Sequence, residues 1–391
     1  MKKREGGFSL IELVIAVAIV LVVLASAMSF FIISMKQFKT QTKITASGME
    51  GIMGLELLRR DIEDMGFGLP WNNLPAYTEA NGNAAVLNDG PNIAPRAIVG
   101  MDNPGFTLNN SDYLAIKSAK VGVVAVTGVG RTSPAGKWTH LGYTGNKRVW
   151  APASENMVDS DHVIVLAVGS TDANRRWLVN PAGASYTTYN NTAAYVPDEM
   201  RSTNIIYGIA DSSTPMLVRP FNRADYYVSS TVGLVPKHCA PGTGVLVKGL
   251  LSHDAAGTIS ELPLLDCVAD MQVAYGLFDP VARQVIWSSE LVSSTGVELT
   301  AAEIRDQLVE VRVSILAQEG QMDESFRYPN DIIFVGSMGV GRNFDINTLP
   351  EQIHIMGSAH LQCSVCGGNH KARHYRWKVH NLAVRPLSLA Q

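Results

Sequence analysis

The chain has 391 residues, a net charge of −3 at pH 7 and a hydrophobic fraction of 46%. This charge balance provides no broad basic surface for phosphate groups, which argues against direct binding of nucleic acid. The length exceeds what one hydrophobic core usually organises, so more than one structural unit is expected.

The first 35 residues form three adjacent blocks. A short basic head, MKKREGG, is followed by FSLIE and then by an uncharged, mostly apolar run at residues 13–35. As a helix, this run is long enough to cross about 30 Å of hydrocarbon. Lys2, Lys3 and Arg4 precede it, so the positive-inside rule predicts a cytoplasmic start and a head outside the inner membrane.

Two features separate this start from a secretory signal peptide. The small residues Gly6 and Gly7 lie before the apolar run, whereas a signal peptidase site follows it. Glu12 lies at the edge of the run, where a carboxylate is costly and is usually partnered and functional. Cleavage between Gly7 and Phe8 would create an α-amino group that is mostly protonated at neutral pH. We expect Glu12 of one subunit to meet that ammonium on Phe8 of the next.

The segment GG-FSLIE followed by a β-branched and leucine-rich run resembles the class III leader of type IV pilins and type II secretion pseudopilins. In those families a prepilin peptidase cleaves after the glycine and methylates the new terminus. The resemblance implies that residues 1–7 are a leader, that Gly7 and Phe8 flank the cleavage site, that Phe8 is N-methylated and that Glu12 is the assembly carboxylate. The alternative is a single-pass membrane anchor in which Glu12 has no assembly role.

A helix is expected over residues 8–64, with residues 8–35 in the membrane or filament core. Its second half carries an apolar stripe at 3–4 spacing, and Gly66, Gly68 and Pro70 end it. The stripe consists of Ile44, Gly48, Gly51, Leu55, Leu58, Ile62 and Met65. Gly48 and Gly51 on this stripe indicate either close approach of the head or a softer stretch. The pattern LELLRRDIEDMGFG resembles the end of the long helix in PilW-like minor pilins, which are related to J-type pseudopilins.

The rest of the chain, residues 65–391, is expected to form a β-rich, mostly antiparallel head, which makes the fold α+β. Period-two patterns predict strands at residues 271–277 and 309–317, and Thr300 with Glu303 predicts a capping box before the latter. Shorter strands are expected at residues 113–116, 121–126, 163–168, 205–209 and 245–247.

Two lobes are expected in the head, at about residues 65–235 and 236–391. Segments in the second half look like PilW-family segments; they start at Arg219, Cys239, Leu264 and Tyr375. Residues 70–200 resemble no family, so their function is left open.

The four cysteines leave several interpretations open. An even count in a translocated head favours disulfides among Cys239, Cys267, Cys363 and Cys366. The rival is zinc, because C-x2-C-x3-H-x3-H places His370 and His374 after the second pair, although the short gap strains a tetrahedral site. A zinc site with all four thiolates is the third option, and free or mixed thiols are the fourth. Otherwise, no cofactor is expected.

The sequence contains no complete enzyme motif, so no enzymatic activity is expected. The run from Gly130 to Lys137 has one residue too many for a phosphate loop, and Trp138 stands where Ser or Thr should bind magnesium. No G-x-S-x-G elbow and no H-E-x-x-H occurs.

These observations favour a minor pilin of the PilW type, inserted in the inner membrane with a periplasmic head and then moved to the pilus. The expected partners are other minor and major pilins, the prepilin peptidase and the inner-membrane assembly platform, with no nucleic acid bound directly. A large head is bulky for repeated lateral stacking, which favours a priming or tip position. The alternatives are a J-type minor pseudopilin of a type II secretion system and a membrane-anchored periplasmic metal-binding protein.

Overall fold

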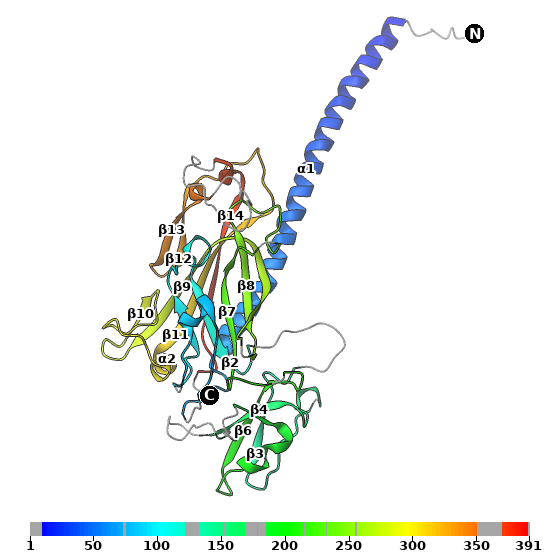
Figure 1. Cartoon of the computed structure of the whole chain (residues 1–391). Coiled ribbons are helices and arrows are strands. Elements are labelled where there is room, and N and C mark those ends of the chain that lie inside the picture. The colour runs from blue at the N-terminus through cyan, green and yellow to red at the C-terminus, as the bar shows by residue number, and fades with distance from the viewer. Residues whose placement is uncertain are drawn as a thin grey trace, which may run out of the picture.

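A computed structural model shows a long N-terminal helix and a β-rich head, which confirms the predicted α+β class (Figure 1). The structure describes residues 10–72, 76–91, 93–121, 133–151, 153–168, 178, 185–214, 216–231, 233–254, 256–349 and 370–389. Of the expected strand at residues 121–126, only Val121 lies among them. Every strand pair in the described part of the chain is antiparallel.

Helix α1 (Leu10–Glu63) runs without interruption for 54 residues, and only its C-terminal part lies against the head (Figure 1). The predicted apolar stripe is confirmed there, because Leu58, Ile62 and Met65 are fully buried. A Cβ atom on Gly51 would lie 2.8 Å from Leu265 Cδ1, so of the two alternatives left open for Gly51 the structure shows close approach of the head.

Gly54 makes an even closer contact, which the sequence analysis did not single out. A Cβ atom at this position would lie 2.0 Å from the carbonyl oxygen of Leu264 on strand β9 (Ile259–Asp279). Polar contacts add to this packing, because Lys248 Nζ lies 2.5 Å from Asp61 Oδ2 and the Tyr226 hydroxyl donates to the same carboxylate. The last turns of the helix are therefore held against the sheet by both shape and charge.

The large sheet has eight strands in the order β1-β2-β7-β8-β9-β11-β14, with β10 paired to β9. Its strands are β1 (Ile98–Met101), β2 (Tyr113–Ser118), β7 (Asn222–Ser229), β8 (Gly244–Leu251), β9, β10 (Gln284–Ser288), β11 (Leu308–Glu319) and β14 (Arg376–Val384). Helix α2 (Ala301–Gln307) leads into β11, and both hydrogen bonds of the predicted Thr300–Glu303 capping box are present. Both predicted period-two strands lie in this sheet, within β9 and β11.

The two faces of the large sheet are covered by different parts of the chain. One face packs its apolar side chains on α1 in the main core. The hairpin of β12 (Ile332–Ser337) and β13 (Val340–Asp345) contributes to a second core with residues of β9, β11 and β14. Residues 76–91, which include the short helix η1 (Gly82–Leu87), cover β2 and β7 on the face away from α1.

A four-stranded sheet, β3-β6-β4-β5, is inserted between β2 and β7 and lies at the end of the head away from the start of α1 (Figure 1). Its strands are β3 (Trp138–Gly142), β4 (His162–Ala167), β5 (Thr187–Thr188) and β6 (Thr203–Ala210). The expected boundary between two lobes near residue 235 therefore does not match the division of the chain between the two sheets. Strands from both sides of that residue pair in the large sheet, because the chain returns to β7 after the insertion.

The two sheets meet at a buried amide and a buried histidine. Asn222 Nδ2 donates to the carbonyl oxygens of Ala119 and Ile209, so its Oδ1 faces His253 Nε2 at 2.9 Å. This arrangement fixes the proton on Nε2, because only a donor satisfies that oxygen. Burial first, and then the nearby Arg219 and His162, lower the pKa of His253 well below its usual value.

Acidification should therefore weaken the protein through His253. The pKa of His253 is lower in the folded than in the unfolded chain. The contribution of His253 to the free energy of unfolding is therefore fully retained above pH 6.5 and is lost as the pH falls. Between pH 7.5 and 5.5 the wild type should lose about 1.4 kcal/mol more unfolding free energy than a His253→Gln variant. The glutamine amide keeps the donor to Asn222 without titrating.

Urea unfolding of both proteins at the two pH values measures this difference. The comparison also removes the opposite contribution of Asp112, because burial raises the pKa of that carboxyl to about 7 in both proteins. Equal losses in wild type and variant would contradict the assignment to His253.

Candidate functional site

The apolar part of α1 projects away from the head (Figure 1). From Leu10 to Met35 the helix is long and apolar enough to cross a membrane, with a mean hydropathy of 2.9. None of this span is buried within the chain. So much apolar surface requires either lipid or other apolar helices around it.

Glu12 lies in the first turn of α1 and is exposed at the free end of this rod. A carboxylate in the first turn interacts favourably with the helix dipole, so Glu12 is locally tolerated there. Gly7 and Phe8 lie outside the described residues. The site is therefore an apolar rod with an acidic side chain near its free end, a geometry suited to side-by-side helix packing.

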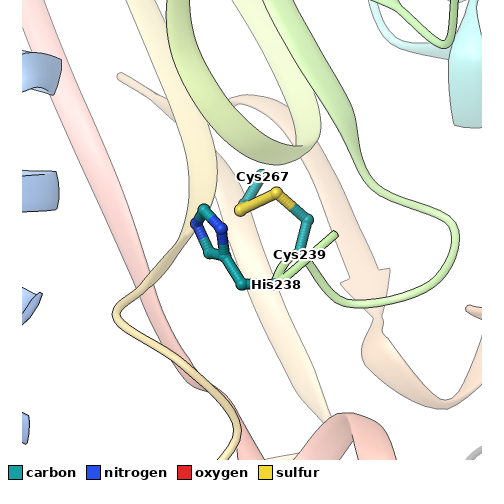
Figure 2. Close-up of side chains that lie close together, drawn as sticks. All are labelled: His238, Cys239 and Cys267. Atoms are coloured by element: carbon teal, nitrogen blue, oxygen red, sulfur yellow. A yellow bond between two sulfur atoms is a disulfide. The ribbon is translucent and has the colours of Figure 1, made fainter. Parts of the chain in front are cut away.

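The second candidate site is in the head, where Cys239 and Cys267 form a disulfide (Figure 2). Cys267 has a positive φ of 56° and lies where β9 passes from pairing with β8 to pairing with β11. Both pairings shift register close to this residue. The disulfide thus fastens the loop before β8 to an irregular point in the longest strand.

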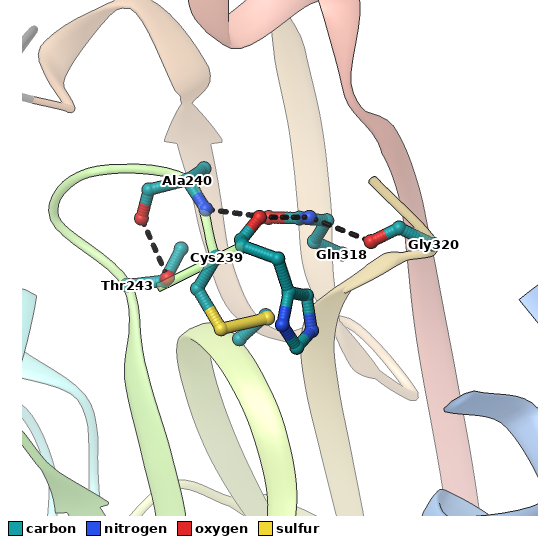
Figure 3. Close-up of a disulfide and its surroundings, with 7 residues drawn as sticks. Cys239, Ala240, Thr243, Gln318 and Gly320 are labelled. Carbon is teal, nitrogen blue, oxygen red and sulfur yellow. Dashed lines mark hydrogen bonds between the residues drawn. A yellow bond between two sulfur atoms is a disulfide. The ribbon is translucent and has the colours of Figure 1, made fainter. Parts of the chain in front are cut away.

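Gln318 on β11 holds the residues on either side of Cys239 in place (Figure 3). Its Oε1 accepts a 2.6 Å hydrogen bond from Ala240 N, and its Nε2 donates to the carbonyl oxygens of His238 and Gly320. Sequence reasoning did not identify Gln318. The sequence gives no signal for it, because Gln318 continues the polar series Glu310, Arg312 and Ser314 of β11, a pattern typical of a solvated face. In the structure its side chain is only 2% exposed.

Removal of the disulfide should destabilise the head. The bond closes a loop with a sequence separation of 28 residues. Loop entropy then predicts that a Cys239→Ser/Cys267→Ser variant loses about 3 to 4 kcal/mol of unfolding free energy. Urea unfolding without reductant measures the loss. If the variant unfolds at the wild-type urea concentration, the disulfide does not stabilise the head.

His238 lies beside this disulfide, and the potential ligand atoms of His238, Cys239 and Cys267 are all within 4.8 Å of one another (Figure 2). Sulfurs bonded to each other are not thiolate ligands, so this group does not hold a metal while the disulfide is intact. The same bond removes two of the thiolates that a four-cysteine zinc site requires.

The expected Cys363/Cys366/His370/His374 set is described only in part. Both cysteines lie outside the described residues, and His370 is described only as the first residue of the short helix η6 (His370–His374). His374 Nδ1 lies 2.7 Å from the carbonyl oxygen of Phe326. That contact leaves the Nε2 atom of His374 as its potential ligand atom.

The start of the chain matches a known sequence motif. Residues 2–28 match the prokaryotic N-terminal methylation motif. No curated protein and no solved structure matches the chain. The motif supports a pilin-like or pseudopilin-like protein that a prepilin peptidase processes and that joins other pilins through its apolar helix.

Proposed function

We propose that the protein is a minor pilin of the PilW type, built into a type IV pilus at its priming or tip complex. The observation that carries the proposal is an exposed membrane-length helix that begins with the methylation motif and ends against a folded head (Figure 1). The apolar surface from Leu10 to Met35 is covered by lipid before assembly and by other pilin helices afterwards.

The priming or tip position is supported by the shape of the head. The inserted sheet extends the head at the end away from the start of α1 (Figure 1). In the inner membrane the N-terminus faces the cytoplasm, so this sheet is the part of the protein farthest from the bilayer. A head that is lengthened in this direction crowds any subunit stacked beyond it, whereas the end of a filament imposes no such limit.

The role is structural rather than enzymatic. Glu12 pairs with the methylated ammonium of Phe8 on a neighbouring pilin, and the prepilin peptidase and the inner-membrane assembly platform act on the chain before that. The J-type pseudopilin alternative shares these steps and differs in the machine that is assembled. It predicts that deletion of the gene impairs protein secretion and leaves pili intact.

Mass spectrometry of the protein purified from membranes tests the processing step. We expect a chain that starts at N-methylated Phe8 and lacks the seven preceding residues. A Gly7→Leu variant should accumulate as the full-length, unmethylated precursor, whereas Lys3→Ala, a change within the leader but away from the cleavage site, should still be processed. An intact Met1 on the wild-type protein in piliated cells would overturn the proposal.

A further inference from the structure

A cleft of about 450 Å³ opens on the face of the large sheet that is turned away from α1. Five separate parts of the chain form it: η1, the segment that leads into η2 (Leu108–Asn110), the start of β2, the end of β7, and the start of β9. Its lining consists of Asn81, Asn83, Ala84, Phe106, Thr107, Leu108, Tyr113, Tyr227, Val228, Ser229, Ser230, Thr231, Ile259 and Glu261. The filament-forming helix is not part of this cleft.

Three aromatic rings form one wall of the cleft. Tyr113 and Tyr227 are opposite each other on β2 and β7, with ring centroids 4.9 Å apart and nearly parallel planes. Phe106 meets Tyr113 edge to face at 5.7 Å. Tyr113 is buried in this row, while Phe106 is 38% exposed and offers its ring to the solvent side.

Two carboxylates, the buried Asp225 and the half-buried Glu261, hold this wall in place. The Tyr113 hydroxyl donates to Asp225 and the Tyr227 hydroxyl to Glu261, each at 2.8 Å. Asp225 in turn accepts hydrogen bonds from Arg223, whose Nη1 also reaches Glu79, 2.8 Å away. The same network therefore fixes the aromatic wall and the segment around η1 that forms the opposite side.

Burying such a network of charges costs desolvation free energy. Lys117, Glu79, Arg223 and Asp225 are all fully or almost fully buried, and apolar residues of similar volume would stabilise the fold as well or better. Ion pairs with fixed geometry do, however, hold side chains in one arrangement. The network thus preorganises the cleft, as binding sites require.

The rim of the cleft is polar but nearly uncharged. Asn83 and Ser230 are exposed, and within the described residues their side chains make no hydrogen bond. Glu261 is the single acid among the described lining residues, which include no Lys, Arg or His. The cleft thus offers amide and hydroxyl groups, one carboxylate and an aromatic ring.

We propose that this cleft binds a neutral saccharide. A sugar ring presents C–H bonds on its faces, which pack on an aromatic ring, and hydroxyl groups at its edge, which pair with amides and carboxylates. Phe106 supplies the ring, Asn83 and Ser230 exchange hydrogen bonds with hydroxyl groups, and Glu261 accepts from one of them. The carboxylate, with no cation beside it in the lining, rejects anionic sugars.

Saturation-transfer NMR on the full chain in lipid nanodiscs tests this proposal, because nanodiscs avoid detergents with sugar headgroups. The probes are the methyl glycosides of glucose, galactose, mannose and N-acetylglucosamine, with N-acetylneuraminic acid as the anionic counterpart. We expect saturable binding of at least one neutral glycoside at millimolar concentration and none of the acid.

Variants locate the binding. Phe106→Ala and Asn83→Ala should each weaken it about tenfold, which corresponds to one lost contact of about 1.4 kcal/mol. Asn83 is exposed and outside the core, so its variant keeps the test valid even if Phe106→Ala disturbs folding. Phe334→Ala is the matched control, because Phe334 is an exposed phenylalanine on β12, outside the cleft lining.

Three outcomes would overturn the proposal: no glycoside of the panel binds, the acid binds as well as the neutral sugars, or binding is the same in wild type and in both cleft variants. None of these outcomes affects the assignment as a pilin, because the cleft and the processing site share no residue.

Discussion

A Glu12→Ala variant should be cleaved and methylated like the wild type and yet be at least about tenfold depleted from filaments, because removing one member of a desolvated charge pair costs about 2 to 5 kcal/mol. In the proposed pilin the peptidase acts at Gly7, which the change does not touch. Packing of the apolar helix beside its neighbours, by contrast, would lose the proposed pairing between the carboxylate and the next subunit's ammonium. The variant should remain in the membrane fraction.

Immunoblots of sheared filaments and of membranes from the same cells measure the ratio of filament-bound to membrane-bound protein for each variant. Leu13→Ala is the matched control, since Leu13 is the adjacent residue, is 60% exposed and carries no charge. It should enter filaments at close to the wild-type level. Equal amounts of the Glu12→Ala and wild-type proteins in the filament fraction would contradict the assembly role of the carboxylate.

The sequence was most informative where the determinants are local. The methylation motif, the apolar run and the capping box at Thr300 and Glu303 are each defined by a few consecutive residues, so no tertiary information is needed to find them. The period-two strands within β9 and β11 were found for the same reason. Whether a segment is helix or strand depends largely on such short-range patterns.

Strand order and the inserted sheet could not be predicted in this way. β2 and β7 are neighbours in the large sheet although about 100 residues separate them in sequence, and no period or turn signal encodes that pairing. Without it, the length of the head suggested a split near residue 235. The structure shows instead that the chain leaves the large sheet after β2 and returns to it at β7.

The cleft was missed for a related reason. The segment YLAIKS contains the charged residue Lys117, and NRADYYV contains Arg223 and Asp225 two positions apart. In a strand, such charges are typical of a solvated face. Residues 76–91 cover that face and bring Glu79 and Asp89 to the charges. Only the folded arrangement shows that the charges are buried and paired.

The largest stability effect should come from breaking this network at Lys117. The Lys117 ammonium lies 2.8 Å from Glu79 and 2.5 Å from Asp89, and all three side chains are almost completely buried. Burial alone would raise the pKa of both carboxyls, but Lys117, with Arg223 beside Glu79 and Arg96 beside Asp89, holds both pKa values below their usual range. A Lys117→Met variant leaves a surplus of buried negative charge and should lose about 3 to 5 kcal/mol of unfolding free energy.

A charge-balanced double variant separates this electrostatic effect from lost packing. Lys117→Met with Glu79→Gln removes one charge of each sign and leaves the pairs Arg223–Asp225 and Arg96–Asp89. The double variant should therefore be more stable than the sum of the two single losses predicts, by about 1 to 3 kcal/mol. Urea unfolding of the four proteins gives this coupling energy.

Lys378→Met serves as the matched control for the change of lysine to methionine. Lys378 pairs with Glu319 at 2.7 Å but is half exposed, so water replaces the lost partner and the unfolding midpoint should change little. If Lys117→Met is as mild as this control, or if the two losses in the double variant are simply additive, the buried charges do not act as one network. The wall of the cleft would then be held mainly by the apolar contacts of Ala84 and Leu87 with the sheet.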